Sequence, residues 1–126
     1  MPETIGSVVV AYNIPGTQTK VVKFTGPVLA DIFQGKITKW NDPQIKVLNA
    51  GVNLPDANIV VVHRSDGSGT NYVWTSYLSS QSLSWNHTGG ASKSVLWPTG
   101  IGVPDNEGVA NAIKGSPDTL GYVDLN

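Results

Sequence analysis

Residues 64–70 gather several groups that could bind a small anion. They read Arg-Ser-Asp-Gly-Ser-Gly-Thr. Arg64 has a planar guanidinium whose donors match two oxygens of a tetrahedral oxyanion. Ser68 and Thr70 have hydroxyl groups that can donate hydrogen bonds, and Gly67 and Gly69 let the backbone approach a ligand closely. This segment therefore predicts an anion-binding site.

Asp66 places a negative charge in the middle of this segment. A carboxylate beside Arg64 can hold the guanidinium in one rotamer and accept hydrogen bonds from backbone N–H groups of the turn. A second hypothesis is that Asp66 accepts a proton from a protonated oxyanion, which would favour hydrogen phosphate over fully ionised sulfate. We expect Asp66 to support the site rather than to bind the anion directly.

The same residue types also occur in an ordinary strand-to-helix turn with a capping residue, so that interpretation stays open. The position of Arg64 favours binding, because it follows the apolar residues 59–62, which predict a buried strand. After Ser68, apolar residues recur three or four apart and predict a helix. Ligands of open α/β sheets bind at the carboxyl ends of strands, and a helix N-terminus attracts anions.

Further predicted elements alternate along the chain and must position this segment. Strands are expected over residues 5–13, 21–24, 58–63, 95–97 and 120–125. Helices are expected to begin near Thr25, near Asp42, from Ser68, and after a loop over residues 100–106. This alternation predicts an α/β fold with a mixed, mostly parallel sheet of about five strands and helices on both faces.

The composition limits the function further. A chain of 126 residues, 40% of them hydrophobic, predicts a single domain over residues 1–126. The formal net charge is -1 and there is no basic run, so no nucleic-acid partner is expected. The chain has no cysteine, which excludes disulfides and thiolate metal sites. No apolar run could span a membrane, and no signal-peptide pattern is present.

Other chemistries find little support in the sequence. His63 and His87 lack carboxylates at ligand spacing, so neither a metal nor a cofactor is expected, and His63 is interpreted as a neighbour of the site. Ser68 does not stand in a G-x-S-x-G elbow, and nucleotide-binding motifs are missing, so no enzyme is expected. Four tryptophans are expected to be buried anchors rather than sugar-stacking platforms: Trp40, Trp74, Trp85 and Trp97.

Four strings resemble, in the same order, the phosphate-binding proteins of the bacterial phosphate ABC transporter. They are residues 32–42, 64–70, 106–110 and 120–123, within a similarity that runs from about Ile5 to Val123. The resemblance implies that Arg64, Ser68, Gly69 and Thr70 contact phosphate and that Asp66 pairs with the arginine. It implies capture of inorganic phosphate for import by a solute-binding protein, without catalysis.

The resemblance also implies a missing half. A complete member of this family is a type II periplasmic binding protein with two lobes, and this chain resembles the central lobe only. We therefore expect weak binding, on the order of millimolar or worse, because an open site resembles an exposed ion pair. A second lobe or a homodimer partner would restore the other wall. In the full-length context the resemblance implies a transporter permease as partner and a periplasmic or extracellular location.

Two other functions stay open at this point. One is a phosphate-ester hydrolase in which Ser68 attacks phosphorus. The other is an interaction module that kept the fold and lost transport. Turnover of a chromogenic phosphate ester would favour the first of these, and chemical-shift changes on phosphate addition confined to residues 67–70 would argue against the second.

Overall fold

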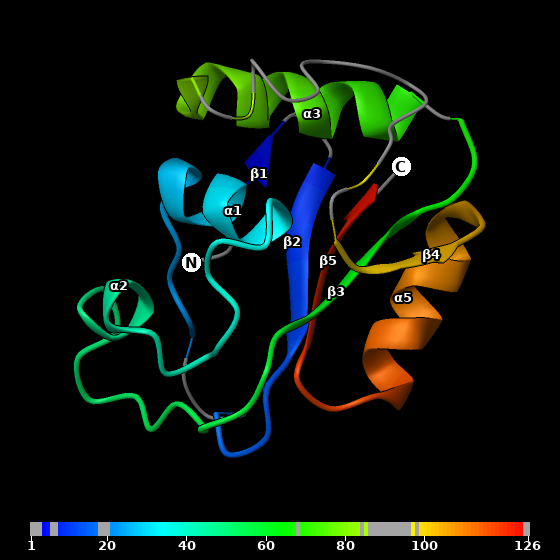
Figure 1. The fold of residues 1–126 in the computed structure, drawn as a ribbon. Helices are drawn as coiled ribbons and strands as arrows, with labels where there is room; N and C mark the ends of the chain where they lie inside the picture. The colour runs from blue at the N-terminus through cyan, green and yellow to red at the C-terminus, as the bar shows by residue number, and fades with distance from the viewer. Residues whose placement is uncertain are drawn as a thin grey trace.

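A five-stranded sheet runs through the centre of the molecule, with helices packed against it (Figure 1). The computed structural model describes residues 4–5, 8–17, 21–67, 69–83, 85, 97 and 99–124. The strands are β1 (Thr4–Ile5), β2 (Val8–Asn13), β3 (Val60–Arg64), β4 (Ile101–Val103) and β5 (Thr119–Asp124), and the helices are α1 (Gly26–Phe33), α2 (Pro43–Lys46), α3 (Gly69–Gln81) and α5 (Asp105–Gly115). Within this part of the chain, no helix combines the length and the apolar character that crossing a membrane requires.

The strand order is β1-β2-β5-β3-β4, which places the last strand of the chain in the middle of the sheet. β3 pairs in parallel with both β4 and β5, whereas β2 pairs antiparallel with β1 and β5. The expected mixed sheet of about five strands is confirmed, although parallel and antiparallel pairs are equal in number. Because β3, β4 and β5 run the same way, their carboxyl ends meet at one edge of the sheet.

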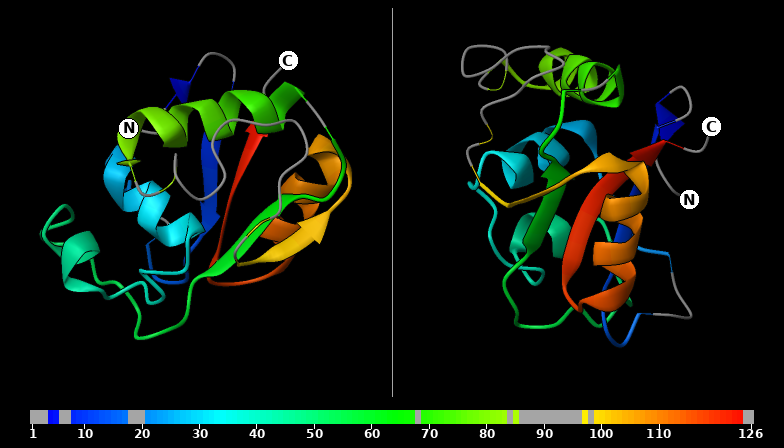
Figure 2. Two further views of the ribbon diagram at one scale, coloured as in Figure 1. Left: turned by 45° about the horizontal axis from the view of Figure 1, so that its top comes forward. Right: turned by 90° about the vertical axis from the view of Figure 1, so that its right-hand side faces the viewer.

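Side chains alternate between the two faces of the sheet, and each face is covered by helix. On one face, Val61 belongs to a large core that includes α1 and α3. On the other face, Val62 packs with Val109 and Ile113 of α5. Figure 2 shows α5 on one side of the strands and α1 on the other. The predicted helical cover on both faces is therefore confirmed.

The helix starts follow the capping signals in the sequence. The side chain of Thr25 accepts a hydrogen bond from the backbone N–H of Val28 at 3.4 Å, and α1 has proline in its first turn. The side chain of Asp42 accepts from the backbone N–H of Gln44 at 2.9 Å and caps α2 in the same way. A side-chain oxygen at this position satisfies a backbone donor that the helix leaves unpaired.

The prediction of a strand over residues 21–24 was wrong. This segment forms no ladder, because side chains satisfy its backbone instead. Asn49 is buried and accepts from the backbone N–H of Lys23 at 2.6 Å, while it donates to the carbonyl oxygen of Lys23 at 2.9 Å. The hydroxyl of Tyr12 accepts from the backbone N–H of Val22 at 2.9 Å.

Two other boundaries differ from the prediction. Residues 5–13 were expected to form one strand, but the structure divides this region into the antiparallel pair β1 and β2. Residues 100–106 were expected to form a loop, whereas Ile101–Val103 is β4, paired with β3 so that Gly102 lies opposite His63. Residues 95 and 96 of the strand expected at 95–97 lie outside the described residues.

Candidate anion-binding site

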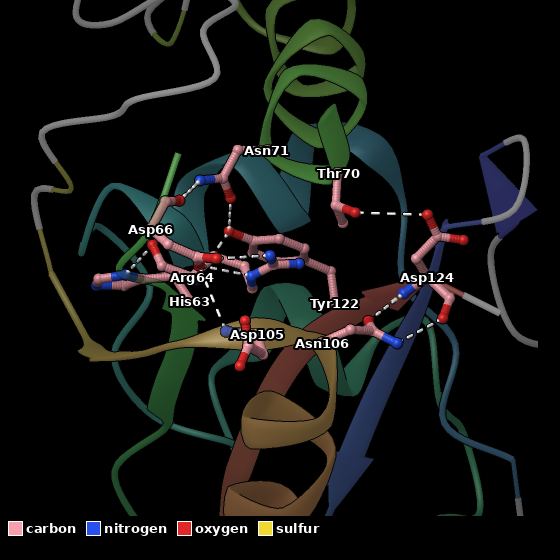
Figure 3. A network of polar contacts seen from close by, with 9 residues as sticks. All are labelled: His63, Arg64, Asp66, Thr70, Asn71, Asp105, Asn106, Tyr122 and Asp124. Carbon is pink, nitrogen blue, oxygen red and sulfur yellow. Dashed lines mark hydrogen bonds and ion pairs between the residues drawn. The ribbon is translucent and has the colours of Figure 1, made fainter. Parts of the chain in front are cut away.

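The carboxyl ends of β3 and β4 each lead into the N-terminus of a helix. β3 ends at Arg64 and α3 begins at Gly69, while β4 ends at Val103 and α5 begins at Asp105. Figure 3 shows the residues that gather at this edge of the sheet, including Thr70 from α3 and Asp124 from the end of β5. Two helix N-termini at one edge produce a positive electrostatic bias there.

Arg64 and Asp66 form a bidentate ion pair at the centre of this edge. Nε of Arg64 donates to Oδ1 of Asp66 and Nη2 donates to Oδ2, both at 2.8 Å. The Arg64 side chain is only 11% exposed. The hydrogen bonds from Arg64 hold the pKa of the Asp66 carboxyl well below its usual range, and the same pair raises the pKa of Arg64. Both groups are therefore charged throughout the physiological range.

The pairing leaves part of the guanidinium available for a ligand. A guanidinium has five N–H donors, and Asp66 takes one on Nε and one on Nη2. Three donors remain, and two of them lie on the edge that joins Nη1 and Nη2, which is the edge that a tetrahedral oxyanion would engage with two oxygens. Figure 3 shows the two hydrogen bonds that join this guanidinium to Asp66.

The start of α5 also contacts the Asp66 carboxylate. The backbone N–H of Asp105 donates to Oδ1 of Asp66 at 3.4 Å, and Asp105 has a φ of 65°. This left-handed conformation is uncommon for a residue with a side chain, and such strain occurs often at functional sites. The carboxylate is thus fixed from two elements, β3 and α5.

The first turn of α3 presents the remaining predicted groups. The hydroxyl of Thr70 donates to Oδ2 of Asp124 at 3.4 Å. Apart from its chain neighbours and its own helix backbone, no described residue has an atom within 4 Å of the place where a Cβ on Gly69 would stand. The first backbone N–H groups of a helix have no partner inside it, and none of the other backbone hydrogen bonds among the described residues uses those of Gly69 or Thr70. Gly67 continues the turn, and Ser68 lies outside the described residues.

Two residues that the sequence analysis did not assign to the site, Tyr122 and Asn71, hold this edge together. Tyr122 of β5 accepts a hydrogen bond at its hydroxyl from the backbone N–H of Arg64 at 3.1 Å and donates to Oδ1 of Asn71. Nδ2 of Asn71 donates to the carbonyl oxygen of Asp66 at 3.0 Å. Burial raises the pKa of Tyr122 far above its usual value, so its hydroxyl stays protonated and remains a donor.

A second clamp joins the start of α5 to the end of β5. Nδ2 of Asn106 donates to the carbonyl oxygen of Asp124 at 2.7 Å, and the backbone N–H of Asp124 donates to Oδ1 of Asn106 at 2.6 Å. Both residues lie at the ends of elements that the sequence predicted. The sequence did not show that β5 lies beside β3 and runs parallel to it, so it could not bring these two residues together at one edge.

His63 lies next to the site but faces an aromatic neighbour. Its ring stacks on Trp97 with centroids 4.8 Å apart and planes at 17°. Burial lowers its pKa. His87 lies outside the described residues, and among the described ones no group of three or more His, Cys, Asp or Glu could hold a metal ion. Three tryptophans are buried as expected, namely Trp40, Trp74 and Trp85, and Trp97 is partly buried.

Comparison with known proteins identifies the family. Residues 2–126 match the family model described as a PBP superfamily domain. The chain is 54% identical over 123 residues to the phosphate-binding protein PstS of Pasteurella multocida and 46% identical over 131 residues to that of Methanocaldococcus jannaschii. Each alignment covers 98% of this chain but only 36% and 34% of the relative, so the chain spans about a third of the length of these relatives.

Solved structures share the fold. A phosphate-binding protein from Stenotrophomonas maltophilia has 25% sequence identity and a TM-score of 0.66, with 93% of this chain and 34% of that one covered. A high affinity periplasmic phosphate-binding protein bound with phosphate has a TM-score of 0.71 at 24% identity, over 93% of this chain and 31% of that chain. The family match over nearly the whole sequence, together with these neighbours, leads to one assignment: the chain belongs to the PBP superfamily.

Proposed function

We propose that this chain binds inorganic phosphate at the edge formed by Arg64, Gly69 and Thr70, with Ser68 as a further ligand and Asp66 and Gly67 as supporting residues. The observation that carries the proposal is the bidentate pair of Arg64 and Asp66. This pair fixes the guanidinium beside the N-terminus of α3 and leaves one donor edge for the anion. Relatives with up to 54% identity are named phosphate-binding proteins, which supports the same ligand.

The role that we assign to Asp66 is to orient Arg64. The hydrogen bonds from Arg64 lower the pKa of Asp66 below that of an ordinary carboxyl group, so Asp66 is a weaker base and is poorly suited to take a proton from the anion. Its two oxygens already accept three hydrogen bonds, two from Arg64 and one from Asp105. These contacts favour a role for Asp66 in orienting Arg64 over a role in selecting protonated phosphate.

The isolated chain is expected to bind phosphate weakly, on the order of millimolar, because the bound anion would stay in contact with water on one side and no second wall would add hydrogen bonds to it. In a complete protein we propose that a second lobe, or in its absence a second copy of the chain, supplies this wall. The larger function we propose is solute capture in the periplasm for an ABC-type phosphate importer, with the permease as partner. No catalytic step belongs to this proposal.

The test is an amide chemical-shift titration with phosphate and then with sulfate at constant ionic strength, alongside a measurement of particle size. We expect saturable shifts confined to the turn after β3 and the first turn of α3. Arg64→Gln should weaken phosphate binding more than tenfold, because it removes the charged, bidentate donor.

Lys114→Gln is the matched control, because it removes one positive charge at the far end of α5, about 14 Å along the helix from Asp105. It should leave the phosphate affinity unchanged. Equal losses in both variants would indicate nonspecific attraction to positive charge and would refute the site. Turnover of a chromogenic phosphate ester that Ser68→Ala abolishes would replace the proposal with the hydrolase alternative.

A further inference from the structure

The hydroxyl of Tyr122 joins three segments that surround the proposed site (Figure 3). It accepts from the backbone N–H of Arg64 at 3.1 Å and donates to Oδ1 of Asn71. Asn71 in turn donates to the carbonyl oxygen of Asp66 at 3.0 Å. One buried hydroxyl thereby links the end of β3, the turn that follows it and the first turn of α3.

The core fixes the position of this hydroxyl. Tyr122 is completely buried, and its ring stacks on Trp74 with centroids 5.1 Å apart and planes at 13°. Phe33 and Trp97 pack against the same ring, with ring centroids 5.9 and 5.8 Å from that of Tyr122. A ring packed on several sides has little rotamer freedom, so its hydroxyl offers a rigid attachment point for the turn above it.

These hydrogen bonds close into a circuit. The backbone of Arg64 is attached to Tyr122, Tyr122 to Asn71, and Asn71 to the backbone of Asp66. The carboxylate of Asp66 then holds the guanidinium of Arg64. The circuit therefore fixes both the main chain and the side chain of Arg64, and it passes through the helix whose first N–H groups face the same edge.

We infer that Tyr122 is a positioning residue for the proposed phosphate site, aligning the Arg64 guanidinium with the N-terminus of α3 through this circuit. The inference rests on the proposed function and deepens it. Both hydrogen-bonding partners of the hydroxyl are protein groups, so Tyr122 acts through Arg64 and Asn71 and does not contact the anion. A misaligned donor pair binds a tetrahedral anion less tightly even when each donor is still present.

The variant Tyr122→Phe keeps the ring and removes the hydroxyl. Arg64 is the only arginine of the chain, so its Nε–H gives a single, assignable signal in a proton–nitrogen NMR spectrum. In the parent protein this signal should exchange slowly with water, because Nε–H donates to Asp66 at 2.8 Å. In Tyr122→Phe we expect faster exchange and a phosphate Kd weakened by about 3- to 10-fold.

Tyr12→Phe is the matched control. The hydroxyl of Tyr12 also accepts from a backbone N–H, that of Val22 at 2.9 Å. Tyr12 lies in β2 opposite Leu120, toward the end of β5 that is remote from Asp124. This control should cost a similar amount of stability but leave the Arg64 signal and the phosphate Kd unchanged. Should Tyr122→Phe fail to fold, Asn71→Ala breaks the same circuit one bond further on.

The two readouts separate this inference from the proposed function. An unchanged Arg64 signal and an unchanged Kd in Tyr122→Phe would overturn the positioning role and leave phosphate binding intact. If the parent protein showed no phosphate binding while Tyr122→Phe still disturbed the Arg64 signal, the circuit would stand and the proposed function would fall. Equal disturbance by Tyr12→Phe would also overturn the inference, since the effect would then be general.

Discussion

Arg64 divides its guanidinium between two tasks. The edge formed by Nε and Nη2 holds Asp66, and the adjacent edge formed by Nη1 and Nη2 keeps two donors. A lysine has a single point charge and no such pair of edges, so it could not bind its orienting carboxylate and present a flat, two-donor face at once. The Asp66 carboxylate is neutralised by one edge of the guanidinium, so its negative charge is compatible with an anion bound at the other edge.

Gly69→Ala separates binding from folding at this site. The Cα–Cβ bond of a helical residue tilts toward the helix N-terminus, so the new methyl group would project toward the side from which the anion approaches. In the part of the chain that the structure describes, no atom outside the neighbouring residues and the helix's own backbone lies within 4 Å of that position. We therefore expect unfolding by urea to give an unchanged stability, or a gain of up to about 1 kcal/mol.

The same variant should weaken phosphate binding by about tenfold or more in a shift titration, because the methyl group blocks close approach to the backbone N–H. An unaltered Kd would mean that the anion binds elsewhere along the edge. Loss of stability with unaltered binding would contradict both parts of the argument.

At the residue scale, the sequence predicted contacts between near neighbours. Arg64 and Asp66 are two residues apart, so their opposite charges predicted the ion pair that the structure contains. Tyr122 is 58 residues from Arg64 and 51 from Asn71. No local pattern places such residues together, although the string at residues 120–123 had been singled out by the family resemblance.

At the scale of elements, Gly121 allows β5 to pass closely between β3 and α5. A Cβ at this position would stand 2.8 Å from the carbonyl oxygen of Val62 and 2.9 Å from Cδ1 of Ile113. Neither distance is compatible with an undisturbed neighbour. The parallel pairing of β3 with β5 and the packing of α5 therefore both depend on the absence of a side chain here.

Gly121→Ala should destabilise the protein by about 2 to 3 kcal/mol, because overpacking forces the sheet and α5 apart. Gly115→Ala is the control, since among the described residues only its chain neighbours and its own helix backbone lie within 4 Å of its Cβ position at the end of α5. That change should be neutral or stabilising by up to about 1 kcal/mol. Urea unfolding of both variants would measure the difference, and equal stabilities would show that the sheet absorbs a methyl group at this point.

The sequence predicted those elements whose signals are local. The caps at Thr25 and Asp42 start helices in the structure as they do in the pattern. β4 was missed because three residues with a central glycine have no strand pattern of their own, and pairing with β3 creates the strand. The error at residues 21–24 has the opposite cause, since an extended apolar segment found its hydrogen-bonding partners in side chains.

For the molecule as a whole, His63 predicts a loss of stability in mild acid. Burial lowers the pKa of His63 below its value of about 6.5 in the unfolded chain. The folded state therefore binds this proton less readily than the unfolded state. The stability that neutral His63 contributes should be fully present above about pH 6.5. The free energy of unfolding should then fall as the pH is lowered below that value.

Urea unfolding at about pH 7.5 and about pH 5.5 tests this dependence. His63→Phe keeps a ring against Trp97 and cannot be protonated, so it should lose less stability over this interval than the parent protein. His87 is present in both proteins and cancels in the comparison. The Asp66 pKa is lowered, so the stability from that carboxylate is lost only below about pH 4 and does not enter this interval. Identical slopes for the two proteins would disprove the assignment to His63.

The fold class could be predicted from the sequence, but the order of the strands in the sheet could not. Alternating strand and helix signals predicted the α/β fold and the helices on both faces. The order β1-β2-β5-β3-β4 did not follow from them, because it depends on which distant segments pair. The convergence of Arg64, Val103 and Asp124 at one edge depends on that order, which is why the surroundings of the site were harder to predict than its central segment.

The place of β5 at the middle of the sheet has a consequence for biosynthesis. Val8 pairs with Asp124, so nearly the whole chain separates the two partners. During synthesis β2 and β3 are made before β5, so the strand edges that pair with β5 stay without that partner until β5 has been made. Such long-range pairing slows folding and prolongs the time for which unpaired strand edges are exposed. The sheet therefore cannot close between β2 and β3 until β5 has been synthesised.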